Sequence, residues 1–184
     1  MSAAATNPLL APFDTPYGVP PFEHVEEAHY LPALAEAMRS HVLEIEAIVA
    51  QSEAPNFTNT IEALDRSGQL LRRVTSVLWA VSSAASTDGL DAIVAKAAPM
   101  LTAHQDDIRL NSALFARIRS VYDARDALAL SADQMKLTVD TFDRFMRSGV
   151  SLNEADKKRL RAINEREASL GEAFAQNVRG DVED

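Results

Sequence analysis

The sequence predicts an all-α protein, an array of five to seven helices that follows an extended, Pro-rich N-terminal arm. Apolar residues recur at helical spacing from about His24 to the end of the chain. No run of about four to eight residues alternates β-branched or aromatic side chains with polar ones, so no strand is predicted. Only six of the 184 residues are Gly and 47% are apolar, which is typical of a helical globular protein.

The arm, residues 1–22, contains five of the eight prolines. Each proline fixes its own φ and disfavours helix at the residue before it. The arm also carries more apolar residues than a solvated linker needs, so we expect much of it to lie along the body of the protein: Leu9, Leu10, Phe13, Tyr17 and Phe22. Residues 23–184 are predicted to form a single helical domain.

Two helices are predicted in the first half of this domain. The first begins near residue 24 and is closed by Pro55. The second begins at Thr58 or Asn59, where Asn59 and Glu62 make a capping-box-like pattern, and continues to about Ser86. Trp79, on this second helix, is expected to be a core anchor because large aromatic side chains bury much apolar surface.

The remaining helices are predicted from the same kinds of start and stop signals. A third begins at Asp88 and contains Pro99 as a kink. A fourth, shorter helix carries Leu114, Ile118 and Val121. A fifth opens with a capping box at Ser131 and Gln134 and ends at 148–149, where Gly is a natural residue after a helix. The last begins at 151 or 153 and runs to about 179; its apolar residues follow one face and its charges the others, the pattern of a long half-exposed helix: Leu160, Ile163, Leu170, Phe174 and Val178.

Composition excludes several classes of function. The net charge of −9 argues against a nucleic-acid or anionic-membrane partner, since both need Lys and Arg to offset phosphate charge. The absence of cysteine excludes disulfides, thiolate metal sites and a cysteine nucleophile. No signal peptide and no apolar run of about 18 residues is present, so we expect a cytoplasmic protein.

The segment HVEEAH at 24–29 resembles a zinc-binding motif but has the wrong spacing. In H-E-x-x-H two histidines four apart share a helix face and bind Zn²⁺, while the Glu acts as base. His24 and His29 are five apart and would point about 140° from one another. The two other histidines, His41 and His104, fall beside apolar stripes and are expected at the edge of the core.

The sequence predicts no other catalytic or ligand-binding group of residues. Glu26 and His29 form one E-x-x-H, but a di-metal bundle needs two, so we expect a helix surface there. The acidic pairs at 26–27 and 106–107 are expected to be solvated, and Arg72–Arg73 to form salt bridges on a helix face. No serine elbow or phosphate loop is present. We therefore predict no catalytic, cofactor-binding or metal-binding residue in this chain.

Several segments nevertheless occur in a familiar order. They are NPLLAPFDTPYGVPPFEHV (7–25), YLPALAEAM (30–38), APNFTNTIEALDRSG (54–68), LNSALFARI (110–118) and RSGVSLNEADKKRLRAINEREASLGEAFAQNV (147–178). The most specific parts are F-x-N-T-x-x-x-L at 57–64, R-S-G at 147–149 and F-x-x-N-V at 174–178. Together they resemble the N-terminal region of bacterial peptidyl-dipeptidases, in the thimet-oligopeptidase and oligopeptidase A family of zinc metallopeptidases.

The resemblance implies a longer, nearly all-helical enzyme that releases dipeptides from the C-terminus of oligopeptides. Its zinc would be held by an H-E-x-x-H motif and a downstream Glu, none of which has a counterpart in residues 1–184. The chain is then expected to contact the catalytic domain, to shape access of oligopeptide substrates, and to bind no zinc and be inactive alone. The alternative is a stand-alone helical module that binds a partner protein.

Overall fold

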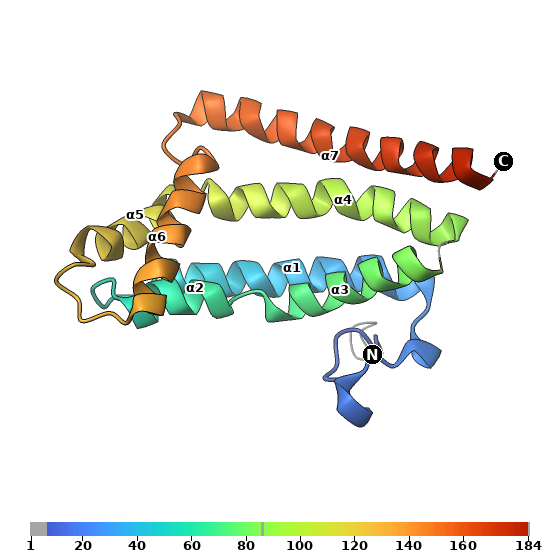
Figure 1. Ribbon diagram of the computed structural model, residues 1–184, viewed down its shortest axis with the longest axis horizontal. Helices are drawn as coiled ribbons and strands as arrows, with labels where there is room; N and C mark the ends of the chain where they lie inside the picture. The colour runs from blue at the N-terminus through green and yellow to red at the C-terminus, as the bar shows by residue number, and fades with distance from the viewer. Residues whose placement is uncertain (1–6, 86, 184) are drawn as a thin grey trace. The chain divides into compact units, whose positions relative to one another are not determined.

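A computed structural model describes residues 7–85 and 87–183 (Figure 1). The α-helices are α1 (Glu27–Val49), α2 (Ala63–Arg66), α3 (Gln69–Ala84), α4 (Asp88–Arg109), α5 (Ser112–Ala124), α6 (Ala132–Arg147) and α7 (Glu154–Glu183). Three short helical segments are η2 (Pro16–Gly18), η3 (Phe22–His24) and η4 (Phe57–Glu62). No strand occurs in the described ranges, which confirms the predicted all-α fold.

The helices belong to two compact units. The described parts of unit 1 fall within Met1–His41, Gly68–Thr102 and Glu165–Asp184, and unit 2 contains Val42–Ser67 and Ala103–Asn164. Helices α1, α4 and α7 therefore contribute residues to both units. Each unit has its own apolar core.

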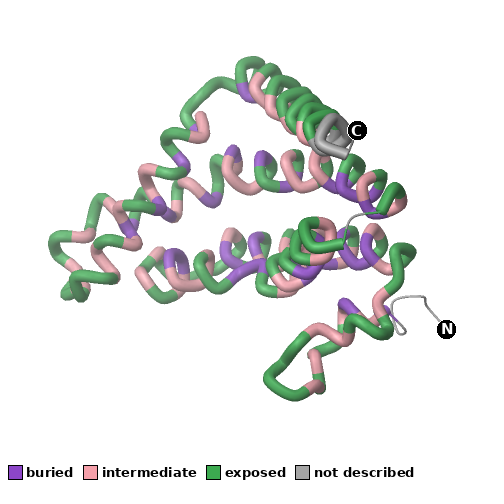
Figure 2. Tube along the Cα trace, turned by 45° about the vertical axis from the view of Figure 1, so that its right-hand side comes forward, coloured by how far each residue is buried: buried purple, intermediate pink, exposed green. Residues whose placement is uncertain are grey.

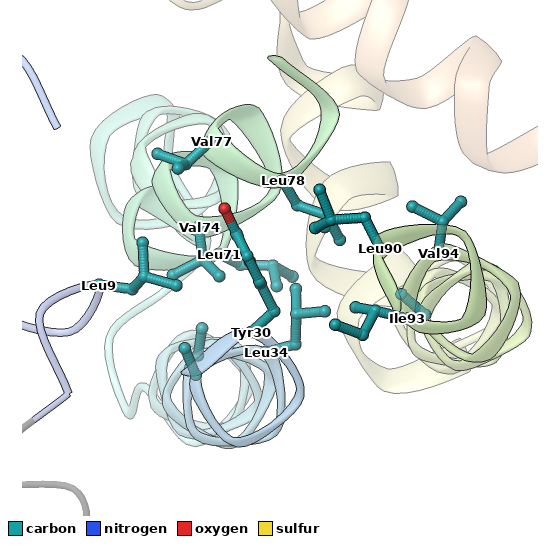
Figure 3. Packing of buried hydrophobic residues seen from close by; sticks show 13 residues of the cluster. Leu9, Tyr30, Leu34, Leu71, Val74, Val77, Leu78, Leu90, Ile93 and Val94 are labelled. Atoms are coloured by element: carbon teal, nitrogen blue, oxygen red, sulfur yellow. The ribbon is translucent and has the colours of Figure 1, made fainter. Parts of the chain in front are cut away.

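The core of unit 1 is formed by one face each of α1, α3 and α4 (Figure 3). Their buried residues recur three or four positions apart, as a single helix face requires. Burying each of the larger aliphatic side chains contributes about 1.5–3 kcal/mol to the free energy of unfolding. The labelled members are Tyr30 and Leu34 of α1, Leu71, Val74, Val77 and Leu78 of α3, and Leu90, Ile93 and Val94 of α4, with Leu9 from the arm.

The described start of the arm is fixed to unit 1. Leu9 is fully buried in the core, and Arg73 of α3 donates hydrogen bonds to the carbonyl oxygens of Leu9 (3.2 Å) and Leu10 (3.0 Å). The Arg73 guanidinium also lies 4.9 Å from the ring centroid of Phe13, within range of a cation–π interaction. Arg73 thus binds the arm rather than forming the predicted salt bridge on a helix face.

Two aromatic residues in the later part of the arm are exposed. Tyr17 and Phe22 are exposed, and Tyr17 adopts a positive φ of 63° inside η2. The expectation that the apolar arm residues lie along the body is therefore confirmed for Leu9, Leu10 and Phe13 and is wrong for these two aromatics. Residues 1–6 of the predicted arm lie outside the described residues.

The second predicted helix is wrong in two places. Its N-cap is Asn56, whose side chain accepts from the Asn59 N–H, so Asn59 is the inner partner of the capping box rather than its first residue. The helix also breaks at Ser67–Gly68, where Gly68 has a φ of 69°. The predicted end near Ser86 lies outside the described residues, and α3 ends at Ala84.

Trp79 is not the predicted core anchor, because 38% of its surface is exposed. The core face of α3 is set by Leu71, Val74 and Leu78. One residue further along a helix points about 100° away, so Trp79 lies at the boundary of that face. The sequence did not reveal the exposure of Trp79, because this residue directly follows the apolar Leu78, which is buried.

The core of unit 2 packs α5 and α6 with η4 and the end of α1. Its buried apolar residues include Ile61 of η4, Leu114 and Ile118 of α5 and Phe145 of α6. Aromatic rings extend it, with the ring centroids of Tyr122 and Phe142 3.9 Å apart. Stacked aromatic pairs add to the stabilisation that apolar burial provides.

The ends of α6 agree with the sequence prediction. Ser131 and Gln134 form a reciprocal capping box at its start. At its end Gly149 has a φ of 86°, and a Cβ there would lie 2.8 Å from Leu152 Cδ1 and 3.0 Å from Leu160 Cδ2. Glycine therefore provides both the left-handed conformation and the space for these two leucines.

Helix α7 is the long final helix of the prediction, but its apolar stripe remains exposed. Asn153 caps it by accepting from the Asp156 N–H. Figure 2 shows mainly intermediate and exposed residues along its described length after its first turns. The exposed apolar residues are Ile163, Leu170, Phe174 and Val178.

Replacing Gly68 with Ala is expected to lower the free energy of unfolding by about 1–3 kcal/mol. The added Cβ would lie 2.8–3.0 Å from the imidazole ring of His41, and an L-residue is strained at this positive φ. Urea unfolding followed by circular dichroism measures the change. Gly171→Ala is the control: nothing lies within 4 Å of its Cβ position in α7, so this variant should be at least as stable as the parent. Equal stability of the parent and Gly68→Ala would contradict the proposed constraint.

Candidate functional site

Of the two histidines of HVEEAH, His29 organises the start of α1. His29 Nδ1 accepts a hydrogen bond from the Glu26 N–H (2.9 Å), and the His29 carbonyl oxygen accepts from Asn7 Nδ2 (2.9 Å). His24 lies in η3 and is exposed. As predicted, Glu26 and His29 lie at the surface where α1 begins, and the structure adds that His29 satisfies a backbone N–H there.

Glu27 connects the starts of two helices of unit 1. Its carboxylate accepts from the Thr87 hydroxyl (2.7 Å), and the same hydroxyl accepts from the Leu90 N–H at the start of α4 (3.1 Å). Glu27 is exposed, as predicted for a solvated acidic pair, but it has a specific partner. A carboxylate near helix N-termini is also favoured by their partial positive charge.

Unit 2 contains a buried carboxylate that the sequence prediction placed in solvent. Asp106 is only 8% exposed, and Asn164 Nδ2 lies 3.0 Å from its Oδ1 and 2.9 Å from its Oδ2. The neighbouring Asp107 remains exposed and lies 3.4 Å from Arg161 Nε. The prediction of a solvated pair is therefore confirmed for Asp107 and wrong for Asp106. The amide that stabilises Asp106 comes from 58 residues further along the chain, so local sequence gave no sign of it.

Lys157 is the second buried charge of unit 2, with 2% of its surface exposed. Its Nζ donates to Ser112 Oγ (2.7 Å) and to Glu154 Oε1 (3.1 Å). A buried ammonium group is costly unless it is paired and hydrogen-bonded. These contacts fix the first turn of α7 beside the start of α5. Sequence reasoning missed Lys157 because lysine is almost never fully buried.

The F-x-N-T part of the family resemblance forms a third polar connection. Asn59 Oδ1 accepts from the Asn56 N–H (2.9 Å), and Arg117 of α5 reaches the same oxygen (3.3 Å). Arg117 also donates to the carbonyl oxygens of Gln51 (2.9 Å) and Glu53 (3.3 Å). The motif therefore joins the loop after α1 to η4 and α5, and its polar groups are used within unit 2.

His104 is buried at the edge of the core, as predicted. Burial lowers its pKa below the ordinary value of 6.5, and the nearby Asp107 carboxylate opposes part of this shift. The imidazole is therefore held preferentially in its neutral form. His41 packs its ring against Gly68, which agrees with its expected position beside the first core stripe.

These polar clusters connect helices within each unit. Across residues 7–85 and 87–183, no three His, Asp or Glu side chains are grouped so that they could hold a metal ion. Asp106, Lys157 and Asn59 each have partners within their own unit. The described side chains therefore do not fit a zinc ion, and no step of a hydrolytic reaction is assigned to them.

Comparison with known proteins shows which proteins are similar to this chain. No protein-family model matches the chain. Dipeptidyl carboxypeptidase of Salmonella typhimurium is 42% identical over 174 residues, which is 95% of this chain and 26% of that protein. The chain is a homologue of this peptidase. Dipeptidyl carboxypeptidase of Escherichia coli is 37% identical over 94% of the chain, and oligopeptidase A of the same organism is 25% identical over 94%.

The resemblance predicted from the sequence is thus confirmed, and its extent is now defined. The chain spans about a quarter of the length of each of these peptidases. Among the residues that the structure describes, none of the helices combines the length and apolar character needed to cross a membrane.

The Asp106–Asn164 pair can be tested with a double-mutant cycle. Asn164→Leu should lower the free energy of unfolding by about 2–3 kcal/mol, because it leaves a buried carboxylate without its donor. Adding Asp106→Leu should recover at least half of that loss, since both polar groups are then removed together. Urea unfolding of the parent, both single variants and the double variant measures the coupling. Additive losses would contradict the pairing.

The environment of His104 predicts how stability depends on pH. Its folded-state pKa lies below 6.5, so the unfolded chain binds a proton first as the pH falls. Protonation of the unfolded state therefore lowers the free energy of unfolding as the pH decreases from about 7.5 to 5.5. His104→Gln should reduce this slope when urea unfolding of the parent and the variant is compared across this pH range. Equal slopes for the parent and His104→Gln would contradict the assignment.

Proposed function

We propose that the chain is the N-terminal helical part of a longer zinc metallopeptidase that releases dipeptides from the C-terminus of oligopeptides. The observation that carries this proposal is the 42% identity to dipeptidyl carboxypeptidase over 95% of the chain but only 26% of that enzyme. The length of the match makes a chance or single-motif similarity untenable. The organisms of the relatives further support a bacterial protein.

The part played by residues 1–184 is structural. Their polar clusters hold helices to one another, and their described side chains do not fit a zinc site. A zinc ion would act in such a peptidase as a Lewis acid and as the activator of a water molecule, with ligands from polypeptide outside this chain. We propose that the chain contacts the catalytic domain, limits access to peptides of suitable size, and is inactive by itself.

The setting is proposed to be the cytoplasm. The absence of cysteine fits a reducing compartment, and the described helices include none suited to spanning a membrane. The negative charge of the chain agrees with peptide substrates rather than nucleic acid.

A second candidate function is a stand-alone module that binds a partner protein. The exposed apolar residues of α7 favour it, because exposed apolar patches often mark interaction sites. This candidate does not account for the extent of the match to dipeptidyl carboxypeptidase. The two candidates differ in the polypeptide encoded beyond residue 184.

The proposal is tested by determining the complete reading frame and purifying its product. We expect several hundred further codons that include H-E-x-x-H, and a product that releases dipeptides from blocked oligopeptides. Chelation should abolish this activity and Zn²⁺ should restore it, whereas residues 1–184 with added Zn²⁺ should show no turnover. A stop codon after Asp184, or zinc-dependent hydrolysis by residues 1–184 alone, would refute the proposal.

A further inference from the structure

The second half of α7 carries an apolar stripe that the other described residues do not cover. Its members are four positions apart, so they lie within about 80° of one another around the helix. Their exposed fractions are high for apolar side chains: Leu170 56%, Phe174 71% and Val178 47%. We call these three residues the α7 stripe.

The opposite side of the same segment is the one partly covered. Ala168, Glu172 and Ala175 are intermediate in burial and, at spacings of four and three, share a face. That face is turned roughly 130° from the α7 stripe. The side with the larger apolar residues therefore points away from the covered side, and the segment uses its less apolar face within the chain.

The described part of the chain does not provide this segment of α7 with the packing that usually stabilises a helix. Helices in proteins derive most of their stability from packing an apolar face. From 165 to 178 none of the described side chains is fully buried, although the segment is helical throughout. A phenylalanine with 71% of its surface exposed gains nothing from burial until another surface covers it.

We propose that the α7 stripe is the surface on which the remaining polypeptide of the full-length peptidase docks. This inference rests on the proposed function, because it takes its occupant from the longer protein. The relatives are about four times as long as the matched segment, so most of such a protein lies outside residues 1–184. The occupant is expected to present aliphatic and aromatic side chains, because the stripe itself offers no charge to pair with.

The charges around the stripe argue against a membrane as the occupant. Surface-binding amphipathic helices are rich in Lys and Arg on their polar face. Residues 165–178 carry three acidic residues and one basic residue: Glu165, Glu167, Glu172 and Arg166. Such a segment is repelled by anionic lipid. A second copy of the chain is an outcome that the experiment distinguishes.

The test compares hydrogen exchange in residues 1–184 with that in the product of the complete reading frame. Docking should slow exchange of the backbone amides at 165–178 at least about tenfold in the longer protein. Leu170→Asp with Phe174→Asp should remove this protection, because it places two carboxylates on the stripe. Ala162→Asp with Ser169→Asp is the matched control; it adds the same charge at exposed positions of α7 away from the stripe and should retain the protection.

The outcomes separate this inference from the proposed function. If the longer protein is an active peptidase but its α7 amides exchange as fast as those of residues 1–184, only the docking inference is overturned. A stop codon after Asp184 overturns both. Concentration-dependent dimerisation of residues 1–184 that Leu170→Asp with Phe174→Asp abolishes, without protection in the longer protein, assigns the stripe to a second copy and overturns the inference.

Discussion

The left-handed turn at Gly68 is the constraint that lets α2 and α3 each pack against the core of a different unit. It follows α2, whose Leu64 packs against the core of unit 2, and it begins α3, whose Leu71 enters the core of unit 1. The imidazole of His41 occupies the space where a side chain at position 68 would lie. In a continuous helix, the direction of the apolar face of α3 would be fixed by that of α2. The break allows each segment to present its apolar face to its own core.

Polar contacts between distant positions then fix how the helices of each unit meet. Arg73 binds the carbonyl groups of the arm, Arg117 binds the loop after α1, and Asn164 binds Asp106. Lys157 adds a buried ammonium group between α5 and α7. Buried groups of this kind are costly when one partner is lost, so they specify a particular packing more than they add net stability. Each of these polar groups is therefore used within its own unit.

The sequence resemblance acquires a physical meaning from these contacts. The F-x-N-T segment forms the capping box and the Arg117 connection, and R-S-G provides the left-handed end of α6. F-x-x-N-V instead lies on the exposed surface of α7, with Phe174 and Val178 uncovered. The segments that carry the resemblance thus include both internal junctions and an exposed surface.

The sequence by itself determined the all-α class, the order of the helices, the capping of α6 and the relationship to the peptidases. These depend on local signals: apolar spacing, capping residues, glycine after a helix and the order of segments. Only the tertiary structure decided the break at Gly68, the burial of Asp106 and Lys157, and the exposure of Trp79 and the α7 stripe. Each of these depends on side chains far apart along the chain, or on which of two apolar faces finds a partner, and a local pattern carries no information about either.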